Sequence, residues 1–364
     1  MYQQVVVENL DFIVISTILF FVSAMLLLLV LSLIQIYIER RRKRMEIRRK
    51  EYVEQINSYI FFGHYEIVLT CRDDYYALAD AIIELNNFIS KEDRGRVFDT
   101  MEKYDLEGFL LKRYHRSVLT LSKRFFLSKL LFISSPRLKG FYLEQIQQQN
   151  FEGMLYAIYS YAELSEDHED LLRITEALSE NYDRGISLKF CEFVFTEAFK
   201  SASTEEVKRF LGEIYERGYS LLLLKGIISA IGDMYYHELK EDILPFFARH
   251  KDDTLFLVTY IRTLHKLGAE DCGLIKEAYL HQEAVIRINL SKYALGLCPG
   301  SLEMLYLYMF DQNYYVRRNF FEALKAEGVS REEIESLVDK HAPNKAKDRF
   351  FLDALNAFFP KEAA

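Results

Sequence analysis

The stretch EEVKRFLGEIYERG, residues 205–218, shows the pattern that decides the fold of most of this chain. Its apolar side chains recur three and four positions apart, at Val207, Phe210, Leu211 and Ile214. On a helix of 3.6 residues per turn this spacing places them on one stripe, with the charged residues on the other faces. The stretch therefore predicts an amphipathic helix that buries one face against another element.

Segments of the same kind recur along the chain. They occupy residues 124–134, 151–164, 188–200, 221–232, 255–268, 283–296 and 314–328. Their ends are about 32 residues apart, which is the length of one helix pair in repeat proteins. Because stacked pairs can bury two apolar stripes whereas an isolated pair cannot, we expect an all-α protein with an α-solenoid of helix pairs. The composition agrees, since 50% of the 364 residues are hydrophobic and only 5 Pro and 15 Gly interrupt helices.

One repeat carries a more specific motif. Residues 311–324, DQNYYVRRNFFEAL, place Val-Arg five and six positions after an Asp and before an Ala-Leu pair. This spacing resembles the HEAT repeat of the HEAT/armadillo-like proteins, and residues 286–296 are similar, although His281 stands at their Asp position. In HEAT proteins the Asp and the Arg form hydrogen-bonded ladders between adjacent repeats. The resemblance implies structural ladder roles for three residues, Asp311, Arg317 and Arg287.

The N-terminal part of the chain has a different character. Residues 12–38, FIVISTILFFVSAMLLLLVLSLIQIYI, contain no ionisable side chain other than Tyr37. As a helix they would be about 40 Å long, enough to cross a hydrocarbon layer of about 30 Å. A buried soluble helix would normally carry polar residues on one face, and a cleaved secretory signal would need a basic start and a shorter apolar run. The segment therefore predicts a single transmembrane helix, with residues 1–11 as a short external tail.

A cluster of eight basic residues follows the apolar run directly. They are Arg40, Arg41, Arg42, Lys43, Arg44, Arg48, Arg49 and Lys50. The positive-inside rule places such a cluster in the cytoplasm, so we expect a protein of the plasma or inner cell membrane with its N-terminus outside and its body in the cytoplasm. The cluster is also suited to attract anionic lipid. We expect residues 39–73 to form a basic juxtamembrane helix and linker, and residues 74–364 to form the HEAT-like repeat domain.

The rest of the sequence argues against several other classes. Beyond Lys50 there are 38 basic and 50 acidic residues, a balance that disfavours nucleic-acid binding. The four cysteines are far apart with no CxxC pair, so we expect unpaired thiols and neither a disulfide framework nor a zinc site.

Patterns of catalysis are missing as well. GxxxxGK, GxGxxG, HExxH and GxSxG do not occur. The best imidazole and carboxylate candidates are residues 165–170, SEDHED, and the pair His237-Glu238, which are more often solvated loop residues. We expect no enzyme activity, no cofactor, no metal site and no small-molecule substrate.

Aromatic residues are abundant, with 25 Tyr and 28 Phe but no Trp. Paired tyrosines could line a face that grips a peptide or a partner helix, although filling the interior between helices is their commoner role. The candidate partner-binding aromatics are Tyr75, Tyr76, Tyr235, Tyr236, Tyr314 and Tyr315.

These observations favour a membrane-anchored cytoplasmic scaffold or adaptor that binds a membrane-bound protein partner through the solenoid. A narrower hypothesis, by architectural analogy, is an accessory subunit of a bacterial envelope or polysaccharide-synthesis (glycosyltransferase) system. Two alternatives are an enzyme on a HEAT-like scaffold, as in alkylpurine DNA glycosylases and bilin lyases, and a self-assembling structural membrane protein.

Overall fold

The computed structural model describes residues 2–63, 67–86, 88–89, 91–147, 151–300 and 302–360. Every regular element in these ranges is a helix, so the prediction of an all-α chain is confirmed for the described residues. The chain divides into two compact units, Met1–Leu138 and Lys139–Ala364. Met1 of the predicted tail and residues 361–364 of the predicted repeat domain lie outside the described residues.

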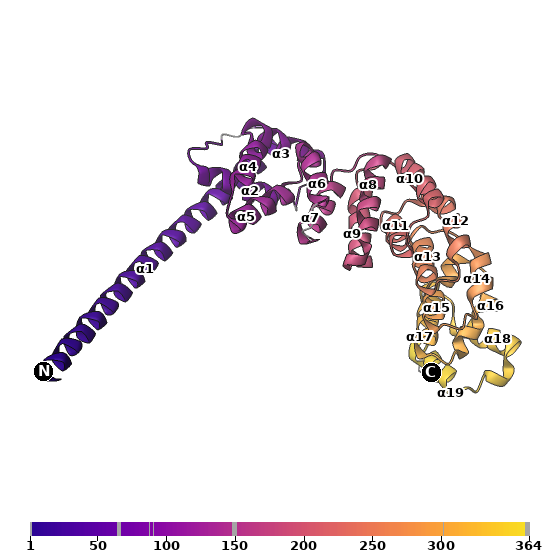
Figure 1. Ribbon diagram of the computed structural model, residues 1–364. Helices are drawn as coiled ribbons and strands as arrows, with labels where there is room; N and C mark the ends of the chain where they lie inside the picture. The colour runs from indigo at the N-terminus through magenta and orange to yellow at the C-terminus, as the bar shows by residue number, and fades with distance from the viewer. Residues whose placement is uncertain are drawn as a thin grey trace. The chain divides into compact units, whose positions relative to one another are not determined.

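The first unit is built on one very long helix. Its elements are α1 (Tyr2–Phe62), α2 (Arg72–Asn86), α3 (Lys91–Lys103), α4 (Leu106–Arg116), α5 (Thr120–Ile133) and the 3-10 turn η1 (Pro136–Leu138). Residues 2–11 of the predicted tail, the apolar run and residues 39–62 of the predicted juxtamembrane segment are therefore parts of the same helix (Figure 1). α1 ends where Gly63 takes the left-handed conformation, with φ 74°, and donates its N–H to the carbonyl of Tyr59 at 2.9 Å.

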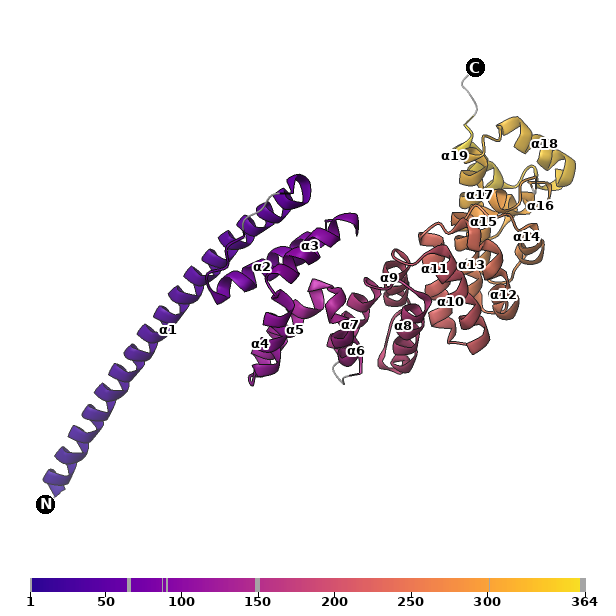
Figure 2. The same ribbon diagram turned by 90° about the horizontal axis from the view of Figure 1, so that it is seen from above.

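The two halves of α1 have different surroundings. Val14 and the large apolar residues from Ile18 to Ile38 are 47% to 73% exposed, and the helix is long and apolar enough to cross a membrane. In the second half Tyr52, Ile56 and Ile60 follow one another at intervals of four and are buried. α2 and α3 pack along this half, as Figure 2 shows. The first unit extends to Leu138, so the predicted boundary between residues 73 and 74 lies inside it.

The second unit contains the remaining helices. They are α6 (Lys139–Ile146), α7 (Phe151–Ala162), α8 (His168–Glu180), α9 (Leu188–Phe199), α10 (Thr204–Arg217), α11 (Leu221–Asp233), α12 (Lys240–His250), α13 (Thr254–Lys266), α14 (Cys272–Ala278), α15 (Ala284–Leu297), α16 (Leu302–Leu305), α17 (Tyr314–Ala326), α18 (Arg331–His341) and α19 (Arg349–Phe358), with the 3-10 turns η2 (Tyr182–Arg184), η3 (His237–Leu239), η4 (Tyr306–Phe310) and η5 (Pro343–Lys345).

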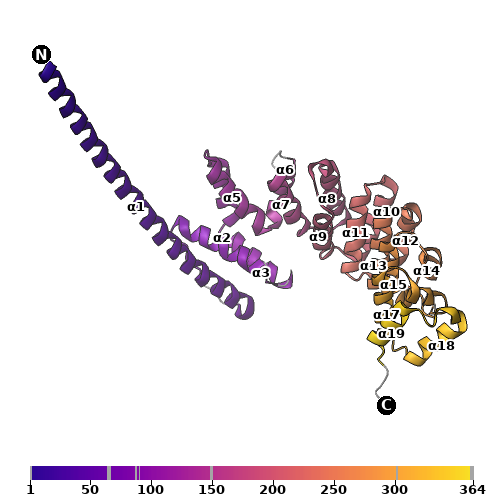
Figure 3. The same cartoon turned by 90° about the horizontal axis from the view of Figure 1, so that it is seen from below.

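These helices pack in a regular order. α7, α9, α11, α13, α15, α17 and α19 each contact the next member of this odd-numbered row, while α8, α10 and α12 contact one another in succession (Figure 3). The arrangement is compatible with a helical solenoid, in which each repeat contacts mainly its neighbours. α9 and α11 are closely packed at Gly226 on α11. A Cβ atom added to Gly226 would lie 2.8 Å from the Cβ of Cys191 on α9, which is too short for a normal contact.

Candidate interaction surfaces

Two arginines of the basic cluster, Arg41 and Arg49, bind α1 to α2. Arg41 donates two hydrogen bonds to the carboxylate of Asp73, from Nε at 2.9 Å and from Nη2 at 2.5 Å. Arg49 Nη1 donates to Glu84 Oε2 at 2.6 Å. The Arg41 bond also lowers the pKa of the Asp73 carboxyl. Sequence reasoning assigned these arginines to the membrane surface alone and missed their structural role.

Asp74 closes the start of α2. Its side chain is 2% exposed and accepts hydrogen bonds from the backbone N–H and the hydroxyl of Thr70 at 2.7 and 2.8 Å and from the N–H of Cys71 at 3.0 Å. Arg48 approaches its other oxygen at 3.7 Å. Burial opposes ionisation, but these hydrogen bonds and the charge of Arg48 outweigh it, so the pKa of Asp74 lies below its ordinary value.

The other basic residues of the cluster stay in solvent. Arg40, Arg42, Lys43, Arg44 and Lys50 are exposed. Lys50 lies 3.8 Å from Glu46 on its own helix, and the other four form no ion pair within the described part of the chain. A strip of cations therefore remains available immediately beyond the apolar half of α1.

Two of the three predicted ladder residues, Arg287 and Asp311, join α15 to the turn before α17. Arg287 on α15 donates from Nε and Nη2 to the two carboxylate oxygens of Asp311, at 2.7 and 3.3 Å. Its Nη1 also donates to the carbonyls of His281 and Gln282 at 2.6 and 2.8 Å. Arg317 on α17 makes the equivalent bonds to the carbonyls six and five residues before it. Both arginines therefore hold the turn that precedes their helix, and Asp311 links one repeat to the next.

An apolar edge runs along the odd-numbered row of helices. In five successive helices of this row, α11, α13, α15, α17 and α19, the residue two positions after the N-cap is apolar and accessible to solvent. These residues are Leu222, Leu255, Val285, Tyr315 and Phe350, and their caps are Ser220, Asp253, Glu283, Asn313 and Asp348. In α9 the same position is Lys189, so the apolar edge begins at α11. Tyr314 lies beside Tyr315 and extends it.

The structure separates the six candidate tyrosines. Tyr314, Tyr315 and Tyr235 are 58% to 60% exposed. Tyr235 follows the C-terminal end of α11, whereas the other two begin α17, so on parallel helices they lie at opposite edges of the row. These three residues therefore do not form one binding face.

The other three tyrosines serve packing. Tyr75 stacks on Phe109 at a ring separation of 4.3 Å, and Tyr76 is buried. The hydroxyl of Tyr236 donates to the carbonyl of Phe199 at 2.6 Å. Only the exposed members of the set can meet a partner without rearrangement of the helices.

The imidazole and carboxylate candidates also make structural contacts. Asp170 is 5% exposed and accepts hydrogen bonds from the hydroxyl of Tyr161 at 2.5 Å and from Lys139 Nζ at 2.8 Å. His168 Nδ1 lies 2.9 Å from Glu206 Oε2 on α10, and His237 Nδ1 lies 2.7 Å from the carbonyl of Leu267. In the described residues no group of three or more His, Cys, Asp or Glu side chains could hold a metal ion.

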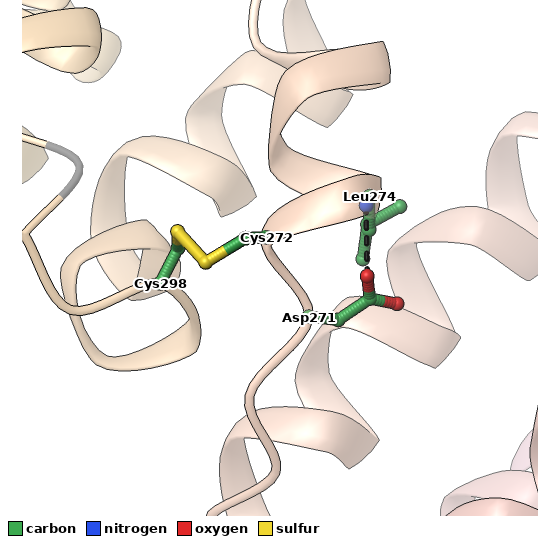
Figure 4. Close-up of a disulfide and its surroundings, with 4 residues drawn as sticks. All are labelled: Asp271, Cys272, Leu274 and Cys298. Atoms are coloured by element: carbon green, nitrogen blue, oxygen red, sulfur yellow. Dashed lines mark hydrogen bonds between the residues drawn. A yellow bond between two sulfur atoms is a disulfide. The ribbon is translucent and has the colours of Figure 1, made fainter.

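The expectation that all four cysteines are unpaired is wrong. Cys272 and Cys298 form a disulfide whose Cα atoms are 4.8 Å apart (Figure 4). The backbone brings them together, because the N–H of Asp271 donates to the carbonyl of Leu297 at 2.8 Å. Cys71 is an exposed free thiol and Cys191 a buried one.

Comparison with known proteins gives no relative. No family model matches the sequence, no curated protein matches it, and no solved structure matches the fold. The resemblance to HEAT repeats therefore rests on the residues of the motif and on the packing of the helices.

Proposed function

We propose that this chain is a single-pass membrane protein that presents a HEAT-like α-solenoid as a docking platform for a membrane-bound protein partner. The observation that carries the proposal is α1, one helix whose first half exposes apolar side chains on every face and whose second half is packed into the folded body. Such a helix would link the first unit rigidly to the bilayer. It would also raise the concentration of the body near partners in the same membrane.

The apolar edge supplies the docking surface in this proposal. Aromatic and aliphatic side chains that are exposed on four helices and half-buried at Leu222 on the fifth offer a long contact to an extended segment or a helix of a partner. No residue is assigned a chemical step. The narrower hypothesis of an accessory subunit for a polysaccharide-synthesising glycosyltransferase stays a proposal by architectural analogy.

The side of the membrane has two opposing indications. The basic cluster after residue 38 favours the cytoplasm for the body, whereas a disulfide is typical of an oxidising compartment. We propose the cytoplasmic orientation because the eight basic residues follow the apolar half of α1 directly. Protease should then digest the body only after the cytoplasmic side is opened, and digestion from the outside would overturn this orientation.

The docking function is tested by co-purification of the full-length protein in mild detergent followed by mass spectrometry. We expect a membrane protein to be retained by the wild-type chain and lost with Tyr315→Asn. The matched control is Tyr235→Asn, which removes an equally exposed tyrosine from the opposite edge. Equal retention by both variants would assign the partner to another surface, and loss with both would indicate a general defect of the fold.

A further inference from the structure

The connection between α4 and α5 is the most exposed apolar feature of the first unit outside α1. Val118, Leu119 and Leu121 are 96%, 72% and 80% exposed. Leu119 occupies the N-cap of α5 and makes no cap hydrogen bond, although small polar residues stabilise this position best. Large apolar side chains therefore stand at this connection, which we call the α4–α5 tip, although they serve neither packing nor helix capping there.

Basic side chains surround this tip. On the α4 side lie the exposed Lys112 and Arg116, and on the α5 side the exposed Lys123 and Arg124. Apolar side chains flanked by cations are typical of segments that insert into the boundary between lipid headgroups and acyl chains. An interface with another protein would more commonly be depleted of lysine.

The tip lies level with the end of the apolar half of α1. A cleft of about 910 Å³ separates α1 from α5, and both Ile38 and Leu121 line it. Figures 2 and 3 place the α4–α5 connection on the side of this unit that faces the N-terminal half of α1. A bilayer that ends near Ile38 would therefore meet Leu121 at the same depth.

The walls of the cleft combine the two chemistries of a phospholipid. Apolar side chains come from Ile38, Met45, Leu121, Phe125 and Phe126, and cationic ones from Arg41, Arg42 and Arg49. Two carboxylates also line the cleft, and each has a lysine partner: Glu46 lies near Lys50, and Asp80 is paired with Lys129. Arg41 and Arg49 are already paired with Asp73 and Glu84. Arg42 has no ion pair within the described residues, so its guanidinium is the one left to meet an anion there.

We propose that the α4–α5 tip is a second membrane contact. It inserts Val118, Leu119 and Leu121 into the leaflet from which α1 emerges, and an anionic phospholipid of that leaflet places its phosphate against Arg42 in the cleft. The inference rests on the proposed membrane insertion of α1. It adds that the first unit is bound to the bilayer at two points, which fixes its rotation about α1.

The test uses the full chain reconstituted in vesicles of phosphatidylcholine, with or without phosphatidylglycerol. A photoreactive p-benzoylphenylalanine replaces Leu119, and in separate proteins Leu28 in the apolar half or Phe62 at the far end of α1. Phe62 is a matched control, because it is 75% exposed but lies about 36 Å of helix beyond Ile38. We expect lipid adducts at positions 28 and 119, with at least tenfold more at 119 than at 62.

Each other outcome is decisive. Adducts at 28 without an excess at 119 over 62 would overturn the second contact and leave the span intact. No adducts at 28 would overturn the membrane insertion and with it this inference. Adducts at 119 to a second copy of the chain instead of lipid would make the tip a protein interface.

The assignment of the phosphate is tested separately, with the photoreactive residue at position 121. Arg42→Gln should lower the yield of phosphatidylglycerol adducts several-fold. The control is Arg40→Gln, which removes an exposed cation that does not line the cleft. Equal losses with both variants would overturn the role of Arg42 and leave a general attraction of the basic cluster for anionic lipid.

Discussion

Replacing Arg287 by Gln should weaken the contact between α15 and α17 in the second unit. The wild-type guanidinium makes four hydrogen bonds, two to the carboxylate of Asp311 and two to carbonyls of the turn before α15. A glutamine side chain is shorter, carries no charge and can replace at most one of them. Asp311 would keep its contact with the N–H of Asn313 at 2.8 Å but would lose its cation.

The magnitude follows from burial. The side chains of Arg287 and Asp311 are 18% and 11% exposed, so water can only partly replace the lost partner. Removing one member of a buried pair costs about 3–5 kcal/mol, and the residual exposure places this case near the lower limit, about 3 kcal/mol. The matched control is Arg318→Gln, since Arg318 and Glu322 are 48% and 46% exposed and such a pair contributes about 0.5 kcal/mol or less.

Hydrogen exchange of the full chain in detergent micelles can measure this difference locally. A loss of 3 kcal/mol should speed exchange of the amides of α15 and α17 roughly 100-fold, while amides of α9 should change little because repeats interact mainly with their neighbours. Adding Asp311→Asn to Arg287→Gln should restore about 1–2 kcal/mol, because the unpaired carboxylate is removed. Equal exchange in the Arg287→Gln and Arg318→Gln proteins would refute the ladder as a source of stability.

Three further predictions concern other parts of the molecule. Reducing the disulfide should lower the free energy of unfolding by about 3–4 kcal/mol for a loop of this length; in urea titrations Cys298→Ser should match the reduced protein. The folded pKa of Asp74 lies below the unfolded value of about 3.9. Its contribution to folding stability is therefore complete above that pH and is lost as the pH falls through the folded pKa. The melting temperatures of wild type and Asp74→Asn should converge in acid, and a difference that widens there would contradict the direction of the pKa shift. Gly226→Ala should lower the free energy of unfolding by about 1–3 kcal/mol, because the added methyl group would clash with α9. Gly212→Ala, whose methyl group meets no neighbour, should stabilise α10 by about 0.5–1 kcal/mol. Thermal melts that rank the two variants the other way would show that the contact between α9 and α11 is looser.

The features that the sequence predicts correctly depend on local periodicity. The stripe at Val207, Phe210, Leu211 and Ile214 is buried in α10, as the spacing of three and four requires. The apolar run and the basic cluster lie on one helix because no proline or glycine interrupts them before Gly63. Such patterns can be predicted from the sequence because they depend only on the number of residues per helical turn.

The features that the sequence does not predict depend on distant segments meeting. The disulfide joins residues separated by 26 positions, and nothing near either cysteine indicates the other. The pairing of Arg41 with Asp73 needs the register of α1 against α2, which periodicity does not determine. Tertiary packing sets both.

The candidate tyrosines differ in their surroundings. Tyr75 and Tyr76 both contact the ring of Phe109. Tyr314 and Tyr315 contact each other at a ring separation of 5.5 Å and stay exposed. The apolar edge could have been found from a different signal, an apolar residue two positions after each capping residue, as in Asp253-Thr-Leu255 and Asp348-Arg-Phe350.

The attachment of α2 to α1 bears on how an anchored platform would work. A flexible linker would let the body sample a wide volume, with an effective concentration that falls as the linker lengthens. Here the helix that leaves the apolar half continues without interruption to Phe62, and Arg41 and Arg49 fix α2 to it within the first turns beyond Ile38. The first unit would then follow the tilt and rotation of α1, so a membrane partner that contacts this unit would meet a preset orientation and lose less rotational freedom on binding. Inserting Gly-Ser residues between Ile38 and Arg41 should therefore weaken co-purification of such a partner while leaving membrane insertion intact; undiminished recovery would show that the anchor supplies proximity alone.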